Sequence, residues 1–100
     1  MSIPGGTTAT KDATDEVQHI IEKVKDQVLG KVNDALDNYK AVSFKTQVVA
    51  GLNYFIKVDI GSDRYIHLRV FRPLPFDNEE KFELHSVQEH KSKEDELKYF

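Results

Sequence analysis

The sequence predicts an α+β fold in which one long α-helix packs across an antiparallel β-sheet of four to five strands. Between residues 14 and 38, apolar side chains recur at three- and four-residue spacing, as they do on the buried face of a helix. From residue 41 to 60, and again from 65 to 71, apolar and polar side chains alternate, which is typical of half-buried strands. Glycine, proline and aspartate separate these segments and mark the turns.

Composition points to one domain, spanning residues 1–100, because 100 residues support a single hydrophobic core. The chain contains no cysteine, so disulfides, thiolate metal ligands and a cysteine nucleophile are excluded. A cysteine-free chain suits a reducing compartment, and residues 1–10 lack the basic and apolar regions of a secretory signal. We therefore expect a cytoplasmic protein. Secretion by a route that needs no signal peptide is also compatible with the sequence.

Charge and hydropathy argue against two classes of partner. The net charge is −3 and the basic residues are scattered, so no electrostatic footprint for nucleic acid is present. No apolar run approaches the roughly 20 residues that a membrane-spanning helix needs. We expect neither nucleic acid nor membrane as a partner.

The first ten residues are expected to form a flexible arm, because Pro4, Gly5 and Gly6 interrupt regular structure. On composition alone this arm is a disordered tail. The helix should begin after Thr14, a suitable N-cap, and end near residues 36–38, with Gly30 inside it marking a bend or close packing. Its predicted buried stripe consists of Val17, Ile20, Ile21, Val24, Val28, Val32 and Ala35.

The alternating run from residue 41 to 60 is too long for one strand, so it must reverse beside Gly51, its one glycine. Paired residues on antiparallel strands share a face, so an odd-numbered connection centred on Val49 keeps the apolar series together. This register pairs Phe44 with Tyr54 and Val42 with Ile56. The strands are then residues 41–48 and 51–60, and the turn is Val48-Val49-Ala50.

Valine is a poor turn residue, because its branched side chain is stiff and prefers extended backbone. Two valines exposed at a bend break the local rules, as residues at functional sites often do. The alternative is that both valines pack under a neighbouring loop.

A second apolar loop follows the strand at residues 65–71, which Pro73 ends. Leu74 and Phe76 flank Pro75 on a turn that should emerge at the same end of the sheet as Val48 and Val49, which favours a contact patch there. The last strand is predicted to place Phe82, Leu84 and Ser86 inward. A C-terminal tail is predicted to pack onto the sheet through Leu97, Tyr99 and Phe100.

The segment Gln47-Val48-Val49-Ala50-Gly51 resembles the QVVAG signature of the cystatin superfamily, and the rest of the chain resembles its stefin (type 1 cystatin) branch. The resemblance implies a cystatin-like fold and a reversible, tight-binding inhibitor of papain-like cysteine proteases of the cathepsin type. It also implies that an N-terminal trunk and two hairpin loops occlude the active-site cleft. The protease-binding residues implied by the resemblance are Ile3, Pro4, Gly5, Gly6, Gln47, Val48, Val49, Ala50, Gly51, Leu74, Pro75 and Phe76. Phe76 departs from the glycine that is usual in the stefin second loop.

The sequence contains no motif for catalysis, cofactor binding or phosphate binding, so we expect no enzyme activity and no cofactor. We expect no metal site either, because His19 and His67 lack ligand partners at metal spacing and fit the surface or the edge of the core. The alternative function is a non-inhibitory interaction protein whose valine-rich bend straightens, so that the monomer forms a domain-swapped dimer. An enzyme remains a third reading, without a nucleophile–base pair to support it.

Overall fold

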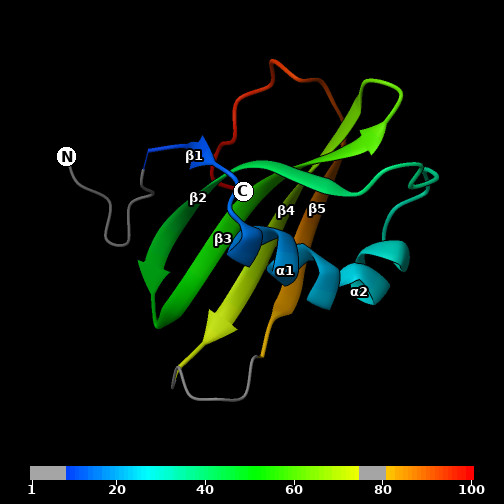
Figure 1. Cartoon of the computed structure of the whole chain (residues 1–100). Helices are drawn as coiled ribbons and strands as arrows, with labels where there is room; N and C mark the ends of the chain where they lie inside the picture. The colour runs from blue at the N-terminus through cyan, green and yellow to red at the C-terminus, as the bar shows by residue number, and fades with distance from the viewer. Residues whose placement is uncertain (1–8, 75–80) are drawn as a thin grey trace.

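The computed structural model describes residues 9–74 and 81–100 and has the predicted α+β architecture. Five antiparallel strands lie side by side in chain order, β1-β2-β3-β4-β5, and two consecutive helices cross the sheet (Figure 1). The elements are β1 Lys11–Asp12, α1 Asp15–Lys23, α2 Lys25–Leu29, β2 Lys40–Val49, β3 Gly51–Gly61, β4 Arg64–Pro73 and β5 Glu83–Lys91. None of the helices in these ranges is long and apolar enough to cross a membrane.

Helix α1 starts where the sequence predicts, because the hydroxyl of Thr14 accepts a hydrogen bond from the backbone N–H of Val17 at 3.3 Å. Gln18 then joins α1 to β2: its side-chain oxygen accepts from the Ala41 N–H at 2.8 Å, and its amide nitrogen donates to the Tyr39 carbonyl at 3.0 Å. These bonds place the buried side of α1 on the sheet.

The prediction of one long helix was wrong. The helix is interrupted at Val24, and α2 ends at Leu29, well before the predicted end at residues 36–38. At the interruption, the Tyr39 hydroxyl donates to the Ile21 carbonyl at 2.7 Å and so competes for the oxygen that an uninterrupted helix offers to Lys25.

Gly30 ends α2, and residues 30–39 form an irregular connection instead of more helix. Tertiary hydrogen bonds hold this connection away from helical geometry. The backbone N–H groups of Asp37 and Asn38 both donate to the Ile60 carbonyl at 3.1 Å, and Arg64 donates to the Ala35 carbonyl at 3.1 Å. Val32 still packs against the core, as predicted. Ala35, the last residue of the predicted buried stripe, is exposed, and Leu36 packs against the core instead, because the chain there is no longer helical.

The hairpin of β2 and β3 turns one residue later than predicted. Val48 pairs with Leu52 and Val49 pairs with Gly51, so Ala50 alone forms the bend. Phe44 consequently faces Ile56, and not Tyr54 as predicted. The predicted assignment of side chains to the two faces of the hairpin is still correct. Moving the centre of the turn by one residue changes each pairing by two positions, so paired residues stay on the same face.

Bulges correct two further predictions. Val42 is not paired with Ile56: the register shifts between Ala41 and Ser43, which leaves Val42 exposed. A second shift, between Leu84 and Ser86 of β5, places Ser86 opposite Arg69, away from the predicted inward series. Val87 packs against the core in its place.

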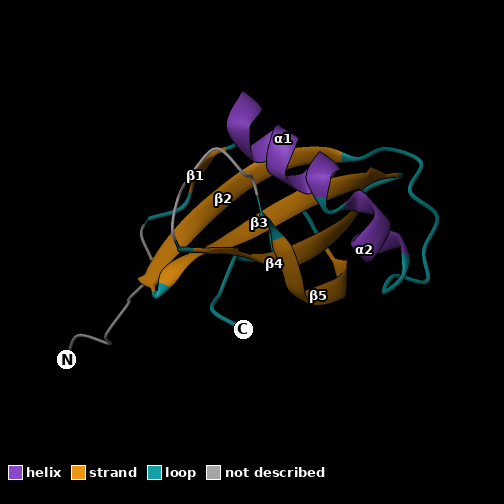
Figure 2. Cartoon of the chain, turned by 90° about the horizontal axis from the view of Figure 1, so that it is seen from below, coloured by secondary structure: helices purple, strands orange, loops and turns teal. Residues whose placement is uncertain are grey.

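The hydrophobic core lies between the helices and one face of the sheet. The helices lie on one side of the sheet in Figure 2, and the C-terminal segment lies on the other. The core consists of Val17, Ile20, Ile21, Val24, Val28, Ala41, Tyr54, Ile56, Val58, Ile60, Ile66, Leu68, Val70 and Leu84.

The C-terminal tail covers the second face of the sheet, as predicted. Leu97 is buried, and the rings of Tyr99 and Phe100 lie 5.7 and 5.8 Å from the ring of Phe55, measured between centroids. The Lys57 ammonium donates to the Lys93 carbonyl at 2.7 Å, which ties the start of this segment to β3. The sheet is therefore covered on both sides.

His67 is fully buried on this second face, deeper than the surface or core-edge position that we expected. Within the described residues, neither ring nitrogen has a hydrogen-bond partner. Lys57 faces it from β3, Lys91 from β5 and Asp95 from the C-terminal segment. Burial, followed by the two lysine charges, lowers the pKa of His67 from 6.5 to about 4, and the Asp95 charge acts in the opposite direction.

This depressed pKa predicts a loss of stability in acid. Below pH 6.5 the unfolded chain protonates His67, whereas the native imidazole stays neutral until about pH 4, so stability falls across this window. Between about pH 7 and about pH 4.5, we expect the free energy of unfolding of the native chain to fall by about 2 kcal/mol more than that of His67→Leu. Urea unfolding at each pH measures the difference. Identical pH profiles for the native chain and His67→Leu would contradict the prediction.

Candidate functional site

The register between β3 and β4 sets the end of β4 beside the bend between β2 and β3. Gly51, the first residue of β3, pairs with Pro73, the last residue of β4. Leu74 therefore leaves β4 beside the bend at Ala50, as the sequence predicted. In Figure 1, β2 and β4 finish at the same end of the sheet.

Large apolar side chains are exposed at this end. Val48 is 64% exposed, Val49 is 40% exposed and Leu74 is 58% exposed. The described part of the chain does not cover them, so the alternative that the valines pack under a neighbouring loop is wrong for these residues. We call Val48, Val49 and Leu74 the apolar edge. Large apolar side chains exposed together at one end of a sheet are typical of a surface that binds another molecule.

Gly51 is required at its position for two reasons. Its φ of +132° is a conformation that side-chain-bearing residues rarely adopt, and a Cβ there would lie 2.4 Å from the Arg72 carbonyl oxygen. The same Cβ would come within 2.9 Å of the Phe71 ring. Glycine thus lets β3 begin in direct contact with β4, which brings the two loops together.

Gln47 lies beneath the apolar edge and is only 7% exposed, so it differs from the exposed valines that follow it. Its side-chain oxygen accepts a hydrogen bond from the Asn53 amide nitrogen at 3.0 Å, across the hairpin. Gln47 and Gly51 therefore support the geometry of the bend, whereas Val48, Val49 and Ala50 are exposed there.

Four residues that were not predicted as site residues support the apolar edge: Phe71, Arg72, Phe82 and His85. The Phe71 ring, which contacts the Gly51 position, stacks on His85 with 5.1 Å between centroids. The Arg72 guanidinium lies 5.7 Å from the centre of the Phe82 ring and also interacts with Tyr54, whose pKa is raised mainly by burial. Phe71 could have been identified from the sequence, because it is a phenylalanine in the β4 series that otherwise consists of Tyr65, His67 and Arg69.

Half of the predicted site residues lie outside the described residues: Ile3, Pro4, Gly5, Gly6, Pro75 and Phe76. The short strand β1 is the described element that follows the predicted arm. Lys11 pairs with Phe44 and Asp12 pairs with Ser43 in an antiparallel register. Read toward the N-terminus, β1 therefore runs in the direction in which β2 approaches the apolar edge.

The side chains at this end of the sheet are suited to binding another molecule and not to catalysis. The exposed side chains of the apolar edge are hydrocarbons, and the chain has no cysteine that could act as a nucleophile. Hydrocarbon groups on a hairpin held by strand pairing gain free energy by entering an apolar groove.

Comparison with known proteins identifies the family. The cystatin domain matches residues 5–94 of the chain. The chain belongs to the cystatin family. It is 50% identical to Cystatin-B of Mus musculus over 96 residues, which are 96% of this chain and 97% of that protein. It is 49% identical to Cystatin-A of Homo sapiens over 98 residues (98% of this chain and 99% of that protein). It is 45% identical to Cystatin-A1 of Sus scrofa over 98 residues (98% and 94%).

These identities confirm that this cystatin is of the stefin, or type 1, branch. The five antiparallel strands with helices packed across them are the fold that the resemblance implied. Family membership supports a role as an inhibitor of cysteine proteases, and it fits the expectation that this cystatin is not an enzyme.

The contact between Gly51 and β4 gives a stability prediction. Gly51→Ala places a methyl group 2.4 Å from a backbone oxygen and at a positive φ, so we expect it to lower the free energy of unfolding by about 1–3 kcal/mol. Gly30→Ala is the matched control, because Gly30 has φ −77° and its Cβ would lie 3.5 Å from the nearest atom, an ordinary contact. Urea unfolding of both variants measures the effect, and equal stabilities would contradict the role assigned to Gly51.

Proposed function

We propose that this cystatin is a reversible, tight-binding inhibitor of papain-like cysteine proteases of the cathepsin type, which it inhibits by filling the active-site cleft with its apolar edge. The observation that carries the proposal is the exposure of Val48 and Val49 at the end of β2 and of Leu74 just after β4, at one end of the sheet. A row of fixed hydrocarbon side chains is complementary to a groove. The relationship to stefins indicates which groove this is, namely the active-site cleft of a papain-like cysteine protease.

Burial of these side chains provides the binding energy. Moving a valine or leucine side chain from water into an apolar site contributes about 1.5–3 kcal/mol when burial is complete. The edge is already ordered by the pairs of Val48 with Leu52 and Val49 with Gly51, so little conformational entropy is lost there on binding.

The same strand pairing explains why the inhibitor is not cleaved. Val48 and Val49 belong to β2 and pair with β3 up to the bend at Ala50. An extended substrate needs its backbone free to lie along the cleft, whereas this backbone is already paired within the inhibitor. The tip then enters the cleft without presenting a carbonyl to the catalytic cysteine, and it blocks access by occlusion.

The N-terminal arm completes the contact on the other side of the catalytic cysteine. The direction of β1 supports this, because β1, followed from Asp12 to Lys11, runs along β2 toward the end of the sheet that carries the apolar edge. Ile3 would fill a specificity pocket, while Pro4 limits the freedom of the unbound arm and Gly5 permits close backbone approach. Pro75 and Phe76 would extend the second loop beside Leu74.

The alternative function is domain exchange, which would involve the same residues at the bend between β2 and β3. Only Ala50 separates the paired residues Val49 and Gly51, so straightening one residue would join β2 and β3 into a continuous strand that a second copy could pair with. Such a dimer would remove the bend that presents the apolar edge. Titrating active-site-quantified papain with separated monomer and dimer fractions distinguishes the two functions, since only the monomer should inhibit.

A charge within the apolar edge should abolish tight inhibition. Val48→Asp replaces the most exposed valine with a carboxylate that the protease would have to desolvate, so we expect the inhibition constant for papain to rise at least about 100-fold, or about 3 kcal/mol. Leu29→Asp is the matched control: Leu29 is 51% exposed on α2, outside the edge, and this variant should inhibit like the native chain. An unchanged inhibition constant for Val48→Asp, with native unfolding behaviour, would refute the proposal.

Removal of the arm tests its separate contribution. Deleting residues 1–6 should raise the dissociation rate from papain roughly 10-fold or more, with little change in association rate, because short-range contacts act mainly on dissociation. Stopped-flow binding measures both rates. Because β1 is retained, thermal unfolding should stay native, and a native dissociation rate would exclude the arm from the interface.

A further inference from the structure

We propose that Asp34, Glu89 and His90 form a zinc site at the end of the sheet opposite the apolar edge. Their ligand atoms, one from each side chain, all lie within 4.8 Å of one another. The His90 Nδ1 lies 3.9 Å from an oxygen of Asp34. This inference does not rest on the proposed function, and it departs from the sequence-based expectation that the chain holds no metal.

A β-bulge in β5 brings Glu89 and His90 together. Neighbouring residues of a regular strand point to opposite faces, so a carboxylate and an imidazole in adjacent positions would not normally meet. Tyr65 pairs with Lys91 and His67 pairs with Gln88, which leaves Glu89 and His90 together opposite Ile66. His90 adopts φ +60° at this point, and its ring is then close to the Glu89 carboxylate.

Arg64 positions the third ligand. Its guanidinium donates to the Ala35 carbonyl at 3.1 Å and to the Asp37 carboxylate at 2.9 Å, which fixes the connection that carries Asp34 against the hairpin of β3 and β4. Arg64 also lies 4.0 Å from one oxygen of Asp34, while the other oxygen is the one that faces His90. The two oxygens of Asp34 therefore have separate partners.

The connection also anchors Glu89. The backbone N–H of Asn33 donates to one oxygen of the Glu89 carboxylate at 2.9 Å. Asn33 and Asp34 are consecutive, so the same turn of chain supplies one ligand and orients another. Asp34 and Glu89 are both partly buried, and His90 is exposed, which leaves a route for an ion and a bound water from solvent.

This donor set fits zinc better than magnesium or calcium. Zinc is held by histidine nitrogen and carboxylate oxygen at about 2.0–2.2 Å, usually with four ligands in tetrahedral arrangement, whereas magnesium and calcium prefer oxygen alone. Tetrahedral bonds of that length place ligand atoms about 3.4 Å apart. Small rotations of the exposed His90 ring would bring its nitrogen from 3.9 Å to that separation, with water as the fourth ligand.

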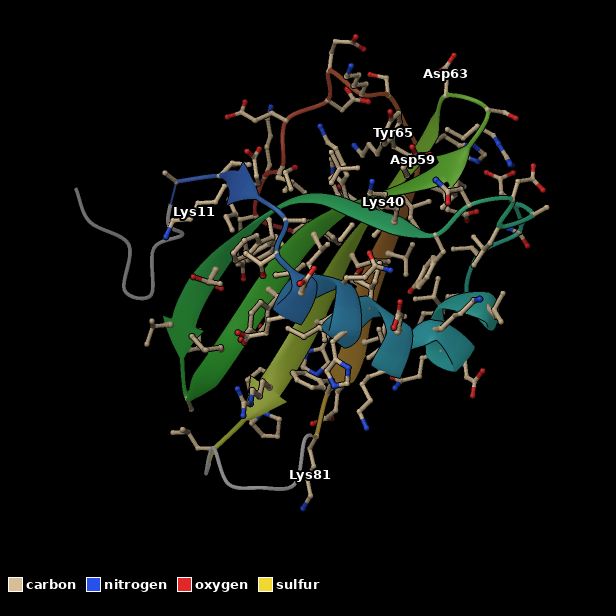
Figure 3. All side chains as sticks on the ribbon, in the orientation of Figure 1. Lys11, Lys40, Asp59, Asp63, Tyr65 and Lys81 are labelled. Atoms are coloured by element: carbon tan, nitrogen blue, oxygen red, sulfur yellow. The ribbon has the colours of Figure 1, made fainter. Side chains whose placement is uncertain are left out.

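The ion would join the connection after α2 to β5. Tyr65 and Asp63 mark this end of the sheet in Figure 3, and Lys81 marks the other, where the apolar edge lies. Because the site spans segments far apart in sequence, it exists only in the folded chain, so zinc should stabilise that chain by an amount that rises with the logarithm of the zinc concentration above the dissociation constant. It should leave the apolar edge unaltered.

Calorimetric titration of the full monomeric chain with zinc chloride, in a buffer that does not chelate, tests the site. We expect one saturable site whose affinity falls at least about 10-fold in both His90→Ala and Asp34→Asn. His19→Ala is the matched control, because His19 is an exposed histidine outside the cluster, and it should change the affinity less than about twofold. Magnesium chloride should give no saturable binding.

Nitrogen-detected spectra of the histidine rings provide a second readout. Zinc should shift the ring resonances of His90 and leave those of His19 and His85 in place. Zinc should also raise the midpoint of thermal unfolding of the native chain and not that of Asp34→Asn, which retains the shape of the side chain. The proposal is overturned by the absence of saturable binding up to about 1 mM zinc, or by equal losses of affinity in His90→Ala and His19→Ala.

Discussion

The contact of the Gly51 backbone with β4 is the constraint on which the geometry of the loop end depends. Because no Cβ separates Gly51 from the Arg72 carbonyl, β3 can begin level with the last residue of β4, and Pro73 pairs with Gly51. That pairing places Leu74 beside the bend. It also explains why the bend consists of Ala50 alone: glycine in the next position takes the φ of +132° that the tight reversal requires.

Burial of both faces of the sheet determines where a partner can bind. The helices cover one face and the C-terminal segment covers the other (Figure 2), so hydrophobic side chains are exposed mainly at the periphery. Within the described residues, three of the six large hydrophobic side chains that are exposed, Val48, Val49 and Leu74, lie together at one end. The second covered face has a further consequence, because the segment that closes it leaves His67 without a hydrogen-bond partner among the described residues.

Local chemistry predicted most of the fold and the exposure of the valines beside the bend. The cap at Thr14, the alternation in three strands and the unsuitable turn residues Val48 and Val49 are short-range signals, and each corresponds to an observed feature. The helix end was mispredicted because tertiary hydrogen bonds to the Ile60 carbonyl and from Arg64 hold residues 35–38 outside the helix, and no local pattern reveals them. The buried role of Gln47 likewise depends on its partner Asn53 across the hairpin.

Bulges account for the remaining differences, and they have a common effect. Each inserts one residue into a strand, so that the residues beyond it change face. At Val42 this exposes an apolar side chain; in β5 it places Val87 in the core where Ser86 was expected. The bulge between Gln88 and Lys91 of β5 sets Glu89 beside His90 and so creates the proposed pair of zinc ligands. A strict period of two cannot predict such positions, because a bulge is defined by a mismatch between two strands. The side chains that a bulge redirects are therefore the ones to inspect for functions that the sequence does not reveal.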